Sequence, residues 1–153
     1  MQFSFTDEQV MIADTAKAFF DDNATSERTR AAMEGAGYDR DLWTSFGAEL
    51  GFAGLAFPEE HGGVGLGLVE QAIVAEAAGY QVASLPMLGT VMVGRAIAAG
   101  GTDEQKSGAL PRLASGETIA ACAKGDVSES GGALSGTLEY VPHGDIADLF
   151  LVV

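Results

Sequence analysis

The sequence is poor in cysteine, histidine and basic residues. Its one cysteine, Cys122, cannot form a disulfide within the chain, and His61 and His143 are too few for a cluster with zinc-ligand spacing. Eight Lys and Arg residues against 22 Asp and Glu residues give a formal net charge of −14. Because such a charge repels phosphates and anionic lipid, we expect neither a nucleic-acid partner nor a membrane partner.

Long apolar runs are also missing. No stretch approaches the roughly 20 unbroken apolar residues of a membrane-spanning helix, and the opening MQFSFTDEQV lacks the basic segment and apolar run of a secretory signal. Hydrophobic residues nevertheless make up 47% of the 153 residues, which is enough to bury a core. With one cysteine and no signal pattern, we expect a globular protein of the reducing cytoplasm.

Hydrophobic spacing and capping residues predict helices over the first three quarters of the chain. The clearest start precedes residues 7–23, where Thr6 can cap the helix and Gln9 can reach back to the backbone of Thr6. Four more helices are expected, each from its capping residue or its apolar stripe. They follow Asp39 up to Leu50, cover about 68–78, follow Ser84 up to Ile97, and follow Thr102 up to Leu113.

Two segments between these helices do not fit a long helix. Residues 25–38 are polar and contain glycine, so we expect an irregular or partly helical link. Residues 52–67 hold five glycines and one proline, a composition that breaks both helix and strand. We therefore expect a long, shaped loop there.

The sequence pattern changes from helical to β-prone after Gly116. TIAACAK, LSGTLEYVP and ADLFLVV are short β-prone runs separated by glycine-rich or His-Gly turns. We predict a helical domain over 1–115 and the beginning of a β domain over 116–153, which the final DLFLVV leaves truncated within a strand. The predicted fold class is mainly α, with five to six helices followed by the first strands of a β domain.

Four segments, in this order, resemble the acyl-CoA dehydrogenase family: FTDEQVMIADTAKAFF, LWTSFGAELGFAGLAFPEEHGGVGLG, GTDEQKSGALPRLASGE and LSGTLEYVPHGDIADLFLVV. The strongest parts are the Trp-to-Gly run over 43–51, the loop over 58–63, and the run over 101–117. The resemblance covers nearly the whole chain. It implies a subunit with an N-terminal helical domain, a middle β domain and a C-terminal four-helix bundle that drives tetramer formation, of which this chain holds the first and part of the second.

The resemblance also implies a chemistry. In the family, FAD lies between the β domain and the C-terminal helices, and a glutamate removes the α-proton of an acyl-CoA thioester while hydride leaves for the flavin. Both family positions for that glutamate lie beyond Val153, so no catalytic residue is assigned and this chain alone is expected to be inactive. The complete protein would bind acyl-CoA and form a homo- or hetero-oligomer. The alternative is a non-catalytic subunit or interaction module with the same helical domain.

One flavin-contacting segment of the family should be present, the strand that typically reads Ala-Leu-Thr-Glu-Pro. Counting without gaps from Glu117 places Ala123-Lys124-Gly125-Asp126 on it, which keeps backbone donors but lacks the Thr hydroxyl. A shift of three residues places Val127-Ser128-Glu129 there and restores a hydroxyl and a carboxylate. The flavin-contacting candidates are therefore Cys122, Ala123, Lys124, Gly125, Val127 and Ser128. The departure from the family pattern is what motivates the non-catalytic alternative.

A second candidate site lies in SLPMLGTVMVGRAI. By the resemblance, Gly89, Thr90, Met92 and Gly94 would line an acyl tunnel, but core packing alone explains these residues equally well.

Five residues also have weaker functional interpretations. Trp43 and Phe46 lie on an aromatic stripe at helical spacing, so we expect them in the core. His61, beside two glutamates, could form a general acid/base pair, but the surrounding proline and glycines favour a solvated turn. Cys122 is expected to be a buried, inert thiol rather than a nucleophile. His143 is expected in an exposed turn.

Overall fold

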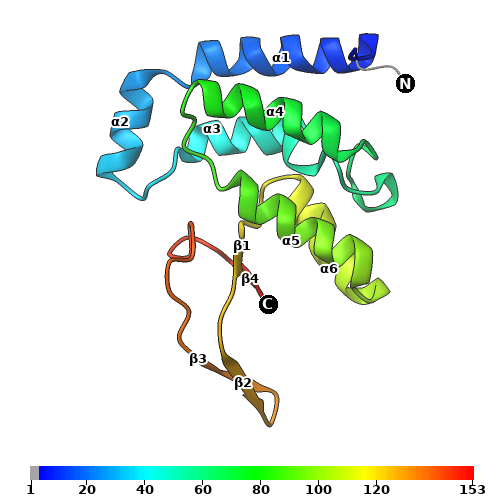
Figure 1. Ribbon diagram of the computed structural model, residues 1–153, viewed down its shortest axis with the longest axis vertical. Coiled ribbons are helices and arrows are strands. Elements are labelled where there is room, and N and C mark those ends of the chain that lie inside the picture. The colour runs from blue at the N-terminus through cyan, green and yellow to red at the C-terminus, as the bar shows by residue number, and fades with distance from the viewer. Residues whose placement is uncertain (1–3) are drawn as a thin grey trace.

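The structure, a computed structural model, describes residues 4–153, so the first three residues of the opening segment lie outside it. Over the described residues the chain forms six α-helices followed by two pairs of strands (Figure 1). The helices are α1 (Asp7–Asn23), α2 (Ser26–Glu34), α3 (Arg40–Thr44), α4 (Leu68–Tyr80), α5 (Met87–Gly100) and α6 (Asp103–Ala114). This confirms the mainly α fold class with strands at its end. None of the described helices is long and apolar enough to cross a membrane.

Two helix starts follow the capping-box pattern that the sequence predicts. The Gln9 backbone N–H donates to Thr6 Oγ1 at 3.2 Å, while the Thr6 N–H donates to Gln9 Oε1 at 3.0 Å. The same reciprocal pair joins Thr102 and Gln105 at the start of α6, at 3.2 and 2.9 Å. Each pair satisfies two amides that a helix start leaves without intrahelical partners.

The predicted cap at Ser84 is wrong. The Ser84 hydroxyl donates to the Gly37 carbonyl at 2.6 Å, and α5 begins at Met87, with Pro86 as its N-cap residue. A proline disfavours helical backbone at the residue before it, so the helix cannot start at Leu85. Ser84 instead joins the segment before α5 to the turn that follows α2.

The segment between α1 and α3 is more regular than a loose link. Ser26–Glu34 form α2, capped by Thr25, whose Oγ1 accepts the Arg28 N–H at 3.3 Å. The helix that follows Asp39 runs as α3 and then as one wide turn over Ser45–Glu49, and the chain leaves it through Gly51 at a φ of 68°. The left-handed backbone at this end is one that glycine adopts at little cost.

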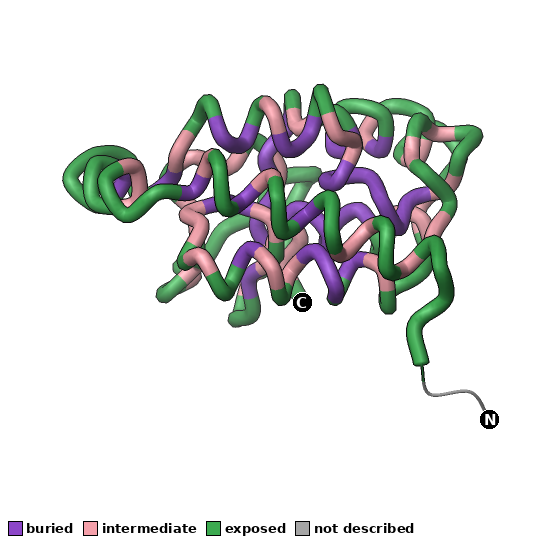
Figure 2. The backbone as a smooth tube through the Cα atoms, turned by 90° about the horizontal axis from the view of Figure 1, so that it is seen from above, coloured by how far each residue is buried: buried purple, intermediate pink, exposed green. Residues whose placement is uncertain are grey.

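An aromatic cluster forms the centre of the larger core. Phe46 is fully buried, with ring centroids 5.5 Å from Trp43, 6.0 Å from Phe20 and 5.7 Å from Phe52. The Trp43 indole N–H donates to the Gly116 carbonyl at 2.9 Å. The core positions predicted for Trp43 and Phe46 are confirmed. Buried and exposed stretches alternate along the helices in Figure 2, as expected of helices that turn one face to a shared core.

The strands form two separate pairs. β1 (Ala120–Ala123) pairs in parallel with β4 (Leu149–Val152), and β2 (Val127–Ser130) pairs antiparallel with β3 (Ala133–Gly136). Gly131 and Gly132 connect the hairpin with φ values of 61° and 79°, the geometry that a two-residue hairpin turn requires. β1 lies against α5, whereas the hairpin lies farther from the helices (Figure 1).

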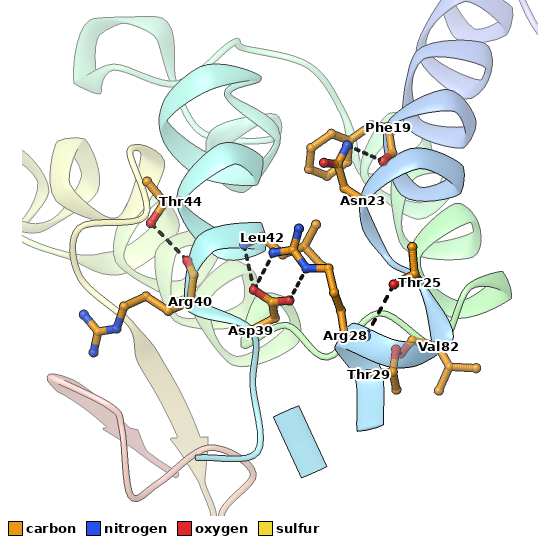
Figure 3. Close-up of polar contacts among 10 residues, drawn as sticks. All are labelled: Phe19, Asn23, Thr25, Arg28, Thr29, Asp39, Arg40, Leu42, Thr44 and Val82. Atoms are coloured by element: carbon orange, nitrogen blue, oxygen red, sulfur yellow. Dashed lines mark hydrogen bonds and ion pairs between the residues drawn. The ribbon is translucent and has the colours of Figure 1, made fainter. Parts of the chain in front are cut away.

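Asp39 links α2 to α3 (Figure 3). Its carboxylate accepts the Leu42 N–H at 3.0 Å as the α3 cap, and it accepts two hydrogen bonds from the Arg28 guanidinium, both at 2.7 Å. The hydrogen bonds from Arg28 hold the pKa of Asp39 below its usual value, although partial burial acts in the opposite direction. A carboxylate with a lowered pKa stabilises the fold above its unfolded pKa, and this contribution disappears as the pH falls through the folded pKa.

We predict that Asp39→Asn lowers the unfolding free energy at pH 7 by about 1 kcal/mol, since the amide keeps an acceptor for Leu42 but loses the charge. Urea unfolding at several pH values should give a difference from wild type that shrinks below pH about 4. Asp21→Asn is the control, because the Lys17–Asp21 pair lies on the surface, more exposed than the Arg28–Asp39 pair, and surface pairs stabilise little. If the loss of unfolding free energy in Asp39→Asn did not change with pH, the ionised Asp39 carboxylate would not be what stabilises the link between α2 and α3.

Candidate functional site

The inner face of α5 packs directly on β1. Thr90 is fully buried, and its Oγ1 accepts the Ala120 backbone N–H at 3.2 Å. A Cβ at Gly89 would lie 2.5 Å from the Ala120 carbonyl oxygen, and a Cβ at Gly94 would lie 2.0 Å from the Phe57 ring. These two glycines are therefore needed for the close approach of the helix to the strand and to Phe57.

The outer face of α5 is apolar and exposed. Met92 is 47% exposed, and Leu88, one turn earlier on the same face, is 69% exposed. The structure thus separates the four residues predicted to line an acyl tunnel: Met92 faces outward, whereas Gly89, Thr90 and Gly94 pack inward. The sequence reasoning placed Leu88 with Met92 on the apolar stripe of this helix but did not propose it as a site residue, although its i, i+4 spacing from Met92 was the signal that could have identified it.

The predicted flavin-contacting residues occupy the end of β1 and the start of β2. Ala123 is buried, Cys122 is partly buried, and Lys124 is exposed. The Val153 N–H donates to the Ala123 carbonyl at 3.0 Å, and the Gly125 N–H donates to the Val153 carbonyl at 3.3 Å. The strand pair therefore fixes the path of the chain as far as Gly125.

Both sequence registers for the flavin segment lead to one shallow hollow. It has a volume of about 330 Å³ and is lined by Gly125, Asp126, Val127, Ser128 and Ser135. The Ser128 hydroxyl lies beside it and donates to the Ser135 carbonyl at 3.2 Å, which leaves its oxygen able to accept. The two alternatives that the sequence left open therefore describe neighbouring parts of the same surface.

These groups fit the edge of a flavin ring but not a whole FAD molecule. The Ser128 hydroxyl already donates its proton to the Ser135 carbonyl, so its oxygen is suited to accept a hydrogen bond from a ring N–H. The volume, however, is at the lower end of the roughly 300–1,000 Å³ of small-molecule pockets, and Asp126 at its wall repels a pyrophosphate. The rest of the cofactor would need other residues.

The remaining candidates show no catalytic arrangement. Glu59–His61 form a short 3-10 turn in which both glutamates are exposed, consistent with the solvated turn favoured from sequence. Cys122 is partly rather than fully buried, and it packs against the second core cluster, which contains Phe57 and Leu110. No group of three potential metal ligands occurs among residues 4–153.

The expectation that His143 is exposed is wrong. His143 is partly buried, with a φ of 56°, and its burial lowers the pKa of the imidazole, partly offset by the Asp145 carboxylate. The Ile146 N–H donates to the His143 carbonyl at 3.2 Å, and Ile146 packs against the larger core. The turn at His143 therefore packs against the larger core through Ile146. Such a contact between distant segments cannot be predicted from the local sequence.

Comparisons with known proteins agree with this geometry. The family model described as the acyl-CoA dehydrogenase N-terminal domain matches residues 6–117. Acyl-CoA dehydrogenase IpdE2 of Mycolicibacterium smegmatis is 33% identical over 147 residues, which cover 95% of this chain and 42% of that protein. The chain therefore spans less than half the length of the curated relatives it matches most fully.

Two solved structures extend the comparison to the fold. A chain in the ChsE4-ChsE5 complex from Mycobacterium tuberculosis matches with a TM-score of 0.89 and 30% identity, over 99% of this chain and 45% of that one. An acyl-CoA dehydrogenase complexed with FAD from Bacillus anthracis matches with a TM-score of 0.74 and 26% identity, over 97% of this chain and 28% of that one.

Proposed function

This chain belongs to the acyl-CoA dehydrogenase family, and we propose that it supplies the N-terminal helical domain and part of the flavin-facing strand surface to an FAD-dependent acyl-CoA dehydrogenase. The reaction would be the α,β-dehydrogenation of a CoA thioester. Because the chain spans less than half of its relatives, this activity is proposed for the complete protein or assembly. We propose the cytoplasm as its location, and residues 1–115 and 116–153 as its two domains.

The observation that carries the proposal is the two-sided packing of α5. Its inner face is fixed to β1 through Thr90, and β1 leads into the hollow at Ser128. Its outer face presents Leu88 and Met92. The outer face of α5 is thus an apolar surface suited to an acyl chain, while its inner face is fixed to the strand that leads to a polar surface suited to a flavin edge.

Each surface would have a separate task. Leu88 and Met92 would contact the acyl chain and exclude water from it. The oxygen of the Ser128 hydroxyl would orient the edge of the flavin ring by accepting a hydrogen bond from it. FAD, when bound, would supply a hydride acceptor. No residue of this chain is proposed to remove the substrate proton.

The complete protein is proposed to work as an oligomer. The ChsE4-ChsE5 complex among the structural neighbours supports an assembly of two different subunits. A non-catalytic subunit is the second candidate function, because the family's Ala-Leu-Thr-Glu-Pro pattern is absent and Asp126 lines the hollow. In that case the chain would contribute only fold and interface to a partner's site.

Flavin retention tests the proposal. The chain is purified together with the subunits that accompany it, mixed with excess FAD, separated by gel filtration and measured by absorbance in the flavin band. We expect retained flavin in the wild type and less in Ser128→Ala, whereas Ser130→Ala should behave as wild type because Ser130 does not line the hollow. Absence of flavin from all three would favour the non-catalytic subunit.

A further inference from the structure

The amides of β1 point alternately to its two edges. The carbonyl groups of Ile119 and Ala123 accept hydrogen bonds from Leu149 and Val153, so these residues turn their polar groups toward β4. In a parallel pair, the intervening residues turn theirs to the opposite edge. Ala120 and Cys122 therefore present their N–H groups on the edge away from β4.

Thr90 occupies the first position of this edge. Its hydroxyl oxygen accepts the Ala120 N–H at 3.2 Å, and Gly89 brings the helix backbone against the Ala120 carbonyl. Both partners are almost fully buried. The next amide of the same edge is that of Cys122, a residue expected to contact the flavin.

Thr90 also differs from the other buried polar side chains of the described residues. Gln71 Oε1 and Thr118 Oγ1 are buried without a hydrogen-bond partner between residues 4 and 153, whereas Thr90 Oγ1 has one. A valine at position 90 would fill the same space but leave the buried Ala120 N–H unpaired, which is the costly case for a hydrogen bond. The Thr90 hydroxyl is therefore needed to satisfy the buried Ala120 N–H.

We propose that Thr90 is a positioning residue: its hydroxyl holds the Ala120 amide on the β1 edge opposite β4, and this fixes the course of β1 through Cys122 to the hollow at Gly125 that would receive the flavin edge. The part that concerns flavin rests on the proposed function. The part that concerns β1 rests on the Thr90–Ala120 contact alone.

The test compares Thr90→Val with Thr90→Ser in the full 153-residue chain, by segment-resolved amide hydrogen exchange. We expect Thr90→Val to exchange about tenfold faster over residues 120–124, a factor that corresponds to about 1.4 kcal/mol, with α1 and α4 unchanged. Thr90→Ser keeps the acceptor and should behave as wild type. A general loss of stability would instead accelerate exchange throughout the chain, so a uniform increase overturns the proposal.

Thr118→Val is the matched control, because it removes a buried hydroxyl, two residues before Ala120, that has no hydrogen-bond partner within the described residues. It should leave exchange over 120–124 within about twofold of wild type, since removing an unsatisfied hydroxyl costs little. Equal exchange in Thr90→Val and Thr118→Val would overturn the proposal.

Quenching of FAD fluorescence by the same variants tests the second part. Thr90→Val should weaken FAD binding at least about fivefold, which is about 1 kcal/mol, and Thr90→Ser and Thr118→Val should not. Unchanged binding in Thr90→Val would overturn the positioning of flavin. If the wild-type chain causes no quenching, the flavin contact of the proposed function fails together with this part, while hydrogen exchange still decides whether Thr90 holds β1.

Discussion

Phe46→Ala is expected to lower the free energy of unfolding by about 3–5 kcal/mol, the range for removing a buried phenylalanine ring. Phe46 is fully buried, and it contacts the rings of Phe20 in α1, Trp43 in α3 and Phe52 in the 3-10 turn that follows Gly51. The truncation removes these aromatic contacts and leaves a cavity that the surrounding helices cannot fill. Such a loss is a large part of the roughly 5–15 kcal/mol by which a domain is stable.

Urea unfolding followed by far-UV circular dichroism measures this effect. Met33→Ala is the control, because Met33 is 76% exposed and its truncation should change stability by no more than about 0.5 kcal/mol. If Phe46→Ala were as mild as Met33→Ala, the aromatic cluster would not be the centre of the core.

Gly94→Val is expected to destabilise the fold by about 3 kcal/mol or more, through overpacking. A Cβ at this position would lie 2.0 Å from the Phe57 ring, and Phe57 is itself buried beneath Val93 and Leu110 in the second core cluster. The ring cannot move without displacing that cluster, so α5 would have to shift away from Phe57. The same shift would disturb the Thr90–Ala120 hydrogen bond four residues earlier.

Gly108→Val provides the matched control for this change. Gly108 also lies inside a helix, α6, but a Cβ there meets no atom of residues 4–153 within 4 Å. Only helix propensity then matters, so the change should stay within about 0.5 kcal/mol. Thermal unfolding of both variants distinguishes the two positions, and similar melting temperatures would contradict the close approach of α5 to Phe57.

Much of the fold could be predicted because its signals are local. The capping boxes at Thr6 and Thr102 each lie within four residues, and the aromatic stripe of Trp43 and Phe46 follows helical spacing. Such patterns depend on the nearest turn of the chain, so they predict helix type and core position without knowledge of distant contacts.

The features that sequence reasoning missed depend on contacts between distant segments. Ser84 was predicted to cap a helix, but its hydroxyl donates to the Gly37 carbonyl. His143 was predicted to be exposed, but it is partly buried because its turn packs against the larger core through Ile146. The orientation of α5 is another example. Its inner face is the one that carries Thr90, because Thr90 accepts a hydrogen bond from the distant Ala120 N–H, and this leaves Leu88 exposed on the outer face. The residues of the candidate site could be named from sequence, but their division into two surfaces could not.

Substrate-dependent bleaching of flavin tests most directly the proposal that the outer face of α5 contacts an acyl chain while the strand surface near Ser128 contacts a flavin. The chain is purified with an affinity tag from the cells that produce it, with whatever subunits accompany it, and CoA thioesters are added without oxygen. We predict that flavin copurifies and that its absorbance falls on addition of a CoA thioester, with a smaller fall when Leu88→Asp places a charge on the apolar side. An assembly that carries no flavin, or whose flavin no CoA thioester reduces, would contradict the account.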